Sequence, residues 1–158
     1  MDAKFLAHIE ALRSQLEHLL AIAMAPITPV TLPAKMPKKG VYLLSDENKH
    51  LYVGRSNDIK QRIGRHARPG ATHRKAAFAF RLAREATGNL KPTYKKGEGS
   101  RSALMEDKNF VAAFDSAKVR IRAMNLRFVE ESNPVRQALL EIYVAVVLNT
   151  PHNDFDNH

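Results

Sequence analysis

The chain has 158 residues, 44% of them hydrophobic, and a formal net charge of +9 at pH 7. This length suits one domain, or one domain with an appended segment. The sequence has no cysteine, which excludes a disulfide framework, a thiolate zinc site and a cysteine nucleophile. It also has neither an apolar run near the roughly 20 residues of a membrane span nor a signal-peptide pattern, so we expect a cytoplasmic protein with no membrane partner.

The N-terminal segment is expected to form one helix capped by Asp2. An apolar stripe recurs along it at spacings of three and four residues: Phe5, Ile9, Leu12, Leu16, Leu19 and Ala23. We expect this stripe to pack on its own domain, with the seam of a homodimer as the alternative. Prolines at 26, 29, 33 and 37 then predict an extended connector, which divides the chain into an appended segment, 1–37, and a main domain, 38–158.

The next segment predicts a β-hairpin followed by a helix. Residues 40–44 and 50–54 are typical of two short strands joined by a polar turn. A helix over 59–66 follows, capped by Asn57 or Asp58, and it places Arg62 and His66 on one side.

The second half of the chain predicts further helices and one more strand. Helices are expected over 72–86, where Thr72 is the cap, and over 102–116, with a loop at 91–100 between them. A strand over 118–130 with a bulge near Met124 follows, and then a helix over 134–148 capped by Asn133. This order indicates an α+β domain with a small central antiparallel or mixed sheet flanked by helices.

The positive charge is concentrated in the middle of the chain. Between Arg55 and Arg101 lie thirteen Lys and Arg residues and three acidic residues. Such a localised basic field favours a polyanionic partner such as nucleic acid, although a generally solvated surface explains charge alone equally well. The sequence has no Gly-rich loop that cradles phosphates and no histidine spacing typical of zinc ligands.

Several side chains suit phosphodiester hydrolysis, because a fixed guanidinium and a metal ion stabilise the charge of its transition state. Glu141 interrupts the apolar run 138–148, and its alternative is a narrow polar helix face shared with Gln137. Arg62 and His66 can together receive a phosphate, or else belong to the general basic surface. Tyr42 and Tyr52 occupy matching places in the two strands, where tyrosines are ordinarily packing residues.

In this order and spacing the residues resemble the GIY-YIG nuclease superfamily. Tyr52 follows Tyr42 by ten residues, Arg62 follows ten further on, and His66 stands one helical turn later. The residues that carry the resemblance are Gly40-Val41-Tyr42, Tyr52-Val53-Gly54, Arg62, His66 and Glu141, and both motifs have valine where isoleucine is usual. Asn153, preferred over Asn149, matches the asparagine that follows the family's glutamate, and the tail looks most like the restriction-endonuclease branch.

The resemblance implies a GIY-YIG-like fold over 38–158 and a metal-dependent endonuclease acting on DNA. Tyr42 would be the general base or hold the attacking water, Tyr52 would orient water or phosphate, and Arg62 would stabilise the phosphorane. His66 would relay a proton with Tyr42 or contact phosphate. Lys49 and His50 are alternative bases.

The resemblance also implies a metal ligand and a substrate-binding surface. Glu141 would bind Mg²⁺, with Mn²⁺ as a substitute, and Asn153 would hold the tail in the site. Residues expected to contact nucleic acid are Arg55, Arg65, Arg68, Arg74, Lys75, Lys95 and Lys96, with Lys91, Tyr94 and Arg101 on or beside the expected loop. The alternatives are a non-specific, repair, mobile-element or RNA-directed nuclease, and a nucleic-acid-binding module without catalysis.

Overall fold

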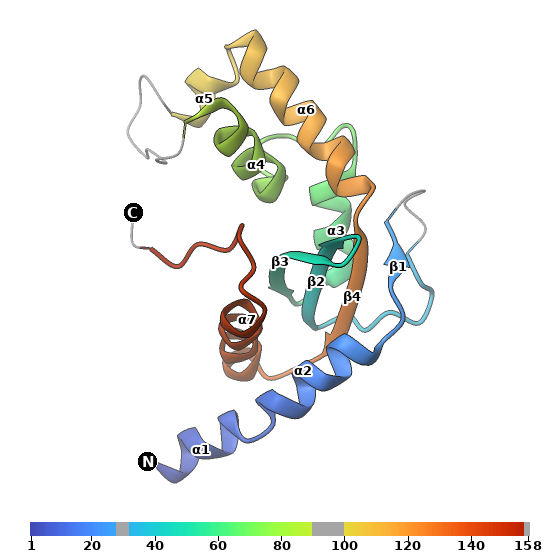
Figure 1. Ribbon diagram of the computed structural model, residues 1–158, viewed down its shortest axis with the longest axis vertical. Helices are drawn as coiled ribbons and strands as arrows, with labels where there is room; N and C mark the ends of the chain where they lie inside the picture. Colours follow the sequence, from blue (N-terminus) through green and yellow to red (C-terminus); the bar gives the residue numbers. More distant parts are fainter. Residues whose placement is uncertain (28–31, 90–99, 157–158) are drawn as a thin grey trace.

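The computed structural model describes residues 1–27, 32–89 and 100–156. Within these ranges four antiparallel strands form one sheet in the order β1-β4-β2-β3. The strands are β1 (Ala25–Pro26), β2 (Gly40–Asp46), β3 (Lys49–Ser56) and β4 (Asn125–Glu130). Figure 1 shows helices on both sides of this sheet, which confirms the expected α+β class.

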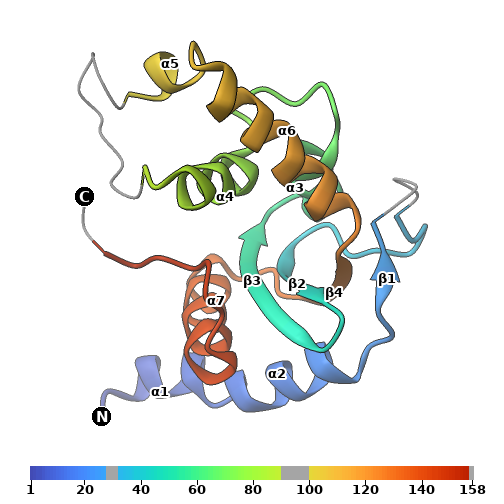
Figure 2. The ribbon, with the colours of Figure 1, turned by 45° about the horizontal axis from the view of Figure 1, so that its top comes forward.

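The helices divide into two groups around the sheet. They are α1 (Ala3–Ile9), α2 (Leu12–Ala21), α3 (Ile59–Ala67), α4 (Ala77–Thr87), α5 (Arg101–Leu104), α6 (Lys108–Arg122) and α7 (Pro134–Leu148). Figures 1 and 2 both show α4, α5 and α6 gathered on one side as a helical lobe, with α2 and α7 on the other. No helix within the described ranges is both long and apolar enough to cross a membrane.

The β2–β3 hairpin is confirmed, and both strands are longer than expected. Tyr42 pairs with Gly54 and Leu44 pairs with Tyr52, so the two tyrosines point to the same face of the sheet. A register shift after Leu44 leaves one extra residue in β3, as in a β-bulge. The extra residue, Leu51, lies next to Tyr52.

The sheet separates two hydrophobic cores. The larger core lies between the sheet and α3, α4 and α6, and it contains Tyr42, Leu44, Ile63, Phe78 and Phe114. The smaller core packs α2 and α7 on the opposite face; its buried members are Leu12, Leu16, Leu19, Val41, Leu43, Val53, Leu140, Val144 and Ala145. The alternation of side chains along β2 explains why neighbouring residues enter different cores.

The N-terminal helix is two helices rather than one. α1 ends at Ile9 and α2 begins at Leu12. α2 contacts both β4 and α7, while α1 contacts α7. Leu12, Leu16 and Leu19 are buried in the smaller core, so the prediction that the stripe packs on its own domain is confirmed for these positions.

The predicted strand over 118–130 is wrong in its first part. α6 continues to Arg122, and β4 begins only at Asn125. Val119 and Ile121 alternate as in a strand, but Phe114, Lys118 and Ile121 lie on one buried helical face. The change of alternation near Met124 is therefore the junction of helix and strand, not a bulge.

Three smaller expectations also need correction. Thr72 does not cap α4: its carbonyl accepts bonds from the amides of Lys75 and Ala76, and α4 begins only at Ala77. The helix expected over 102–116 is split into α5 and α6, because the Asp107 side chain caps a new helix. Pro26 belongs to β1 rather than to a connector.

Candidate active site

Tyr42 and His66 form the centre of the candidate site. β2 supplies Tyr42 and α3 supplies His66, and the Tyr42 hydroxyl shares a hydrogen bond of 2.9 Å with Nε2 of His66. α3 is fixed at its start by Asp58, rather than Asn57, because the Asp58 side chain accepts a bond from the amide of Gln61. Each ring is only 1% exposed. In this structure His66 therefore contacts Tyr42 and is not open to a phosphate beside Arg62.

Tyr52 completes a cluster of three rings. Its ring centre lies 6.3 Å from that of Tyr42 and 6.1 Å from that of His66. Phe78 of α4 stacks on Tyr52 at 4.3 Å with an angle of 14° between the planes. Sequence reasoning missed Phe78, because nothing in the sequence links a phenylalanine of α4 with a strand tyrosine.

Gly54 makes room for Tyr42. A Cβ atom at position 54 would lie 2.4 Å from the Tyr42 hydroxyl oxygen and 2.5 Å from Cζ of the same ring. Both distances are far below van der Waals contact, so the last glycine of the second motif permits the first motif's tyrosine to occupy its place. The sequence contained this signal, since a glycine inside a strand often marks a close approach.

Glu141 and Arg55 form an ion pair where α7 meets the edge strand β3. Nε of Arg55 donates to Oε2 of Glu141 at 3.0 Å, and the two side chains are 47% and 21% exposed. Burial raises the pKa of Glu141, while the positive charges of Arg55 and Arg62 oppose the rise. Glu141 is therefore a carboxylate held in a partly buried place by surrounding cations, rather than one member of a polar helix face.

Arg62 connects these groups electrostatically. Burial raises the pKa of Tyr42 well above its ordinary value; the Tyr52 and Glu141 charges add to the rise, and Arg62 opposes it. The pKa of Tyr52 is raised by burial and by Glu141, and is again lowered by Arg62. The structure thus brings Tyr42, Tyr52, Arg62 and Glu141 into one electrostatic neighbourhood, as the motif order predicts.

His66 is a neutral imidazole in this environment. Burial, and next the charge of Arg62, lower its pKa to about 3. Its Nδ1 is buried and has no hydrogen-bond partner among the described residues. Among the described residues, the hydrogen bond between its Nε2 and the Tyr42 hydroxyl is therefore the one hydrogen bond found for the ring.

Asn153 attaches the C-terminal tail to the edge of β3. Its Oδ1 accepts a bond from the amide of Val53 at 2.9 Å, and its Nδ2 donates to the carbonyl of Val53 at 2.8 Å. The amide of His152 adds a bond to the carbonyl of Leu51. Asn149 has another role, since it ends α7 in the left-handed conformation. The preference for Asn153 therefore agrees with the residue that contacts β3.

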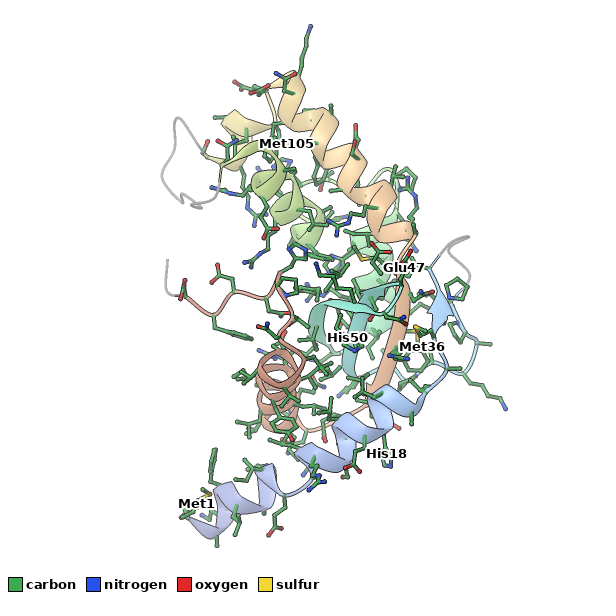
Figure 3. The ribbon with its side chains drawn as sticks, in the orientation of Figure 1. Met1, His18, Met36, Glu47, His50 and Met105 are labelled. Carbon is green, nitrogen blue, oxygen red and sulfur yellow. The ribbon has the colours of Figure 1, made fainter. Side chains whose placement is uncertain are left out.

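Lys49 and His50 lie at the opposite end of the hairpin from the Tyr42–Gly54 pair. They pair with Asp46 and Ser45 next to the turn. His50 shares a hydrogen bond of 3.1 Å with Ser45, and Figure 3 labels His50 together with Glu47 of the turn. The structure does not bring these two alternative bases to the Tyr42 hydroxyl.

Apart from Arg55, the basic residues expected to contact nucleic acid lie in several places. Arg65 and Arg68 lie in and just after the last turn of α3, and Arg68 folds over Gly64. Arg74 and Lys75 are exposed in the turn before α4. Lys91, Tyr94, Lys95 and Lys96 lie outside the described residues. Arg101 contacts its own chain, donating to the carbonyl of His73 and lying 4.8 Å from the centre of the Phe80 ring.

Comparison with known proteins places the chain in a family. Residues 38–144, more than half of the chain, match the family model of the GIY-YIG catalytic domain. No curated protein and no solved structure matches. The matched range contains the two tyrosines, Arg62, His66 and Glu141, and it corresponds to the sheet and helices that bring these residues together. The chain belongs to the GIY-YIG family, whose fold is of the nuclease type.

Proposed function

We propose that this protein is a metal-dependent endonuclease that hydrolyses phosphodiester bonds in DNA. The observation that carries the proposal is the buried hydrogen bond between Tyr42 and His66, formed where the charges of Arg62 and Glu141 act on the same hydroxyl group. This arrangement combines a proton-transfer group with a cation and a carboxylate. A tyrosine that served only for packing would need neither the cation nor the carboxylate near its hydroxyl group.

Glu141 fits a divalent cation that retains most of its water. Among residues 1–27, 32–89 and 100–156, no group of three or more His, Asp or Glu side chains is placed to hold a metal. Mg²⁺ nevertheless binds through one or two carboxylates, with water and phosphate oxygens as the other ligands. A cation bound there would supply positive charge to the oxygens of the phosphorane. Mn²⁺ accepts the same ligands and is the expected substitute.

The remaining chemistry comes from the chain itself. Arg62 would stabilise negative charge on the phosphorane; its positive charge, which lowers the pKa of both tyrosines and of Glu141, supports this role. Tyr42 would hold the attacking water; to accept a proton from it, the Tyr42 hydroxyl must first lose its own proton, a loss that burial opposes and the charge of Arg62 favours. His66 would hold the Tyr42 hydroxyl in place as a neutral ring, and its pKa of about 3 makes it a weak acceptor for the Tyr42 proton.

The exposed basic charge supports a nucleic-acid substrate, and DNA is the proposed choice because of the resemblance to restriction endonucleases. Arg74 and Lys75 are exposed in the turn before α4, and Arg68 is exposed after α3, the helix that supplies Arg62 and His66. Phosphate contacts by such residues position a duplex without reading its sequence. Binding should therefore weaken steeply as the salt concentration rises.

Incubation of the protein with supercoiled plasmid tests the proposal. Nicking is expected with Mg²⁺ or Mn²⁺ and none with EDTA, and Glu141→Ala should lower the rate by about 1,000-fold or more, since a metal supplies several kcal/mol to the transition state. Glu17→Ala, which removes an exposed carboxylate of α2, is the matched control and should cut normally.

The products distinguish the narrower forms of the proposal. Discrete fragments would identify restriction-type cleavage, and a smear would identify a non-specific nuclease. Intact plasmid with cleavage of RNA would overturn the choice of substrate. Intact plasmid and intact RNA, both bound by the protein, would overturn catalysis and leave a binding module.

A further inference from the structure

Arg55 holds the carboxylate that the proposed function assigns to the metal. Its Nε lies 3.0 Å from Oε2 of Glu141. Arg55 immediately follows Gly54, against which the Tyr42 ring packs. The ion pair is therefore part of the candidate site and not a remote surface contact.

A divalent cation and Arg55 compete for Glu141. Both are cations that bind a carboxylate through its oxygens, and the guanidinium occupies one of these oxygens in the structure. Within residues 1–27, 32–89 and 100–156, no group of three or more His, Asp or Glu side chains is placed to hold a metal, so an incoming cation depends on Glu141 itself. The ion pair should therefore weaken metal binding to the protein alone.

Arg55 also has the chemistry to bind a phosphate. A guanidinium pairs with carboxylate and phosphate oxygens in the same geometry. The side chain of Arg55 is 47% exposed, whereas that of Glu141 is 21% exposed. Arg55 is consequently the partner that a nucleic-acid backbone can reach first and draw away from the pair.

We propose that Arg55 exchanges Glu141 for a phosphate of the substrate, and that this exchange makes the binding of metal and of nucleic acid mutually favourable. The inference rests on the proposed function and deepens it. A phosphate that engages Arg55 frees Glu141 for the metal, and a metal on Glu141 frees Arg55 for the phosphate. Because such coupling is reciprocal, each ligand should raise the affinity for the other by the same factor, about 5- to 150-fold.

Metal binding by the protein alone gives the first test. Mn²⁺ is titrated into the protein without nucleic acid, and free Mn²⁺ is measured by electron paramagnetic resonance. Arg55→Gln should bind Mn²⁺ about 5-fold more tightly or better, since the competing guanidinium is absent. Arg13→Gln removes the same charge from an exposed ion pair on α2 and should leave the affinity unchanged.

Binding of duplex DNA gives the reciprocal test. Anisotropy of a labelled duplex is measured in the Tyr42→Phe background, where cutting is suppressed, with Mn²⁺ and with EDTA. Mn²⁺ should raise DNA affinity, and Arg55→Gln should reduce that gain to nearly 1-fold. In EDTA, Glu141→Gln should strengthen DNA binding, and the gain should shrink when Arg55→Gln is also present.

The outcomes separate the exchange from the metal site itself. Equal Mn²⁺ affinity in Arg55→Gln and Arg13→Gln, with binding abolished by Glu141→Gln, would overturn the exchange and leave the proposed metal site standing. If Glu141→Gln left the Mn²⁺ affinity unchanged in every background, the metal site of the proposed function would be overturned.

Discussion

The two faces of the β2–β3 hairpin differ in chemistry although the same strands supply both. Val41, Leu43 and Val53 are buried on the face covered by α2 and α7. The opposite face carries Tyr42 and Tyr52, whose rings meet His66. A strand alternates its side chains, so adjacent residues belong to the core on one side and to the site on the other. Substitutions at neighbouring positions should therefore separate stability from activity.

Leu43→Ala should produce the largest loss of stability. Leu43 is fully buried in the smaller core, and its truncation leaves a cavity between the sheet and the helices that cover it. We expect a loss of about 2–5 kcal/mol in the free energy of unfolding, measured by urea denaturation. Nicking activity per folded molecule should remain normal. A folded Leu43→Ala protein without activity would contradict the separation of the two faces.

Tyr42→Phe, one residue earlier, should have the opposite pattern. The substitution keeps the ring and removes the hydroxyl that His66 holds. Nicking of plasmid should fall by about 100- to 10,000-fold, the usual contribution of a proton-transfer group. Unfolding should become easier by about 1–3 kcal/mol, because Nε2 of His66 loses its partner. Retained nicking would assign Tyr42 to packing alone.

Gly54→Ala should lower both the stability of the protein and its nicking activity, because it displaces Tyr42. The added methyl group would overlap the Tyr42 ring, and the ring is held from its other side by the larger core. Overpacking of this kind costs about 1–3 kcal/mol of stability, and nicking should fall because the hydroxyl moves from His66. A double-mutant cycle with Tyr42→Ala checks the cause: in that background Gly54→Ala should cost much less. An equal cost in both backgrounds would place the strain in the backbone instead.

The parts of the fold that were predictable have local signals. The hairpin has two short apolar stretches around a polar turn, α3 has Asp58 as its cap, and α7 has Asn133 followed by proline. The helical lobe was predicted less well. Residues 118–122 alternate as in a strand, but they continue α6, where Lys118 and Arg122 donate to backbone carbonyls at and just after the end of α3.

The site divides in a similar way. The family resemblance, which the order and spacing of these residues carry, was enough to predict that Tyr42, Tyr52, Arg62 and Glu141 come together. The partner of each group was not predictable, because it depends on tertiary packing. Arg55 was expected to touch phosphate, yet it pairs with Glu141, and Phe78 lies on Tyr52 from a helix outside both motifs.

The smallest expected effect is a pH dependence of stability that comes from His66. In the folded protein its pKa is lowered to about 3, so it stays neutral, whereas in the unfolded chain it takes up a proton below about pH 6.5. Its contribution to stability is therefore fully present above pH 6.5 and is lost as the pH falls toward 3. Between pH 6.5 and 5.5 the loss should be about 1 kcal/mol, because the slope approaches 1.4 kcal/mol per pH unit. Urea denaturation at pH 7.0 and 5.5 measures this loss of unfolding free energy. His66→Gln is the reference: subtracting its loss from that of the parent protein removes the contribution of every other titrating group. His66→Gln should lose less stability than the parent protein over this interval. An equal loss of unfolding free energy in both proteins would mean that the folded protein accepts a proton on His66 as readily as the unfolded chain does. The site face of the hairpin would then shield His66 from water less completely than the apolar face shields Leu43.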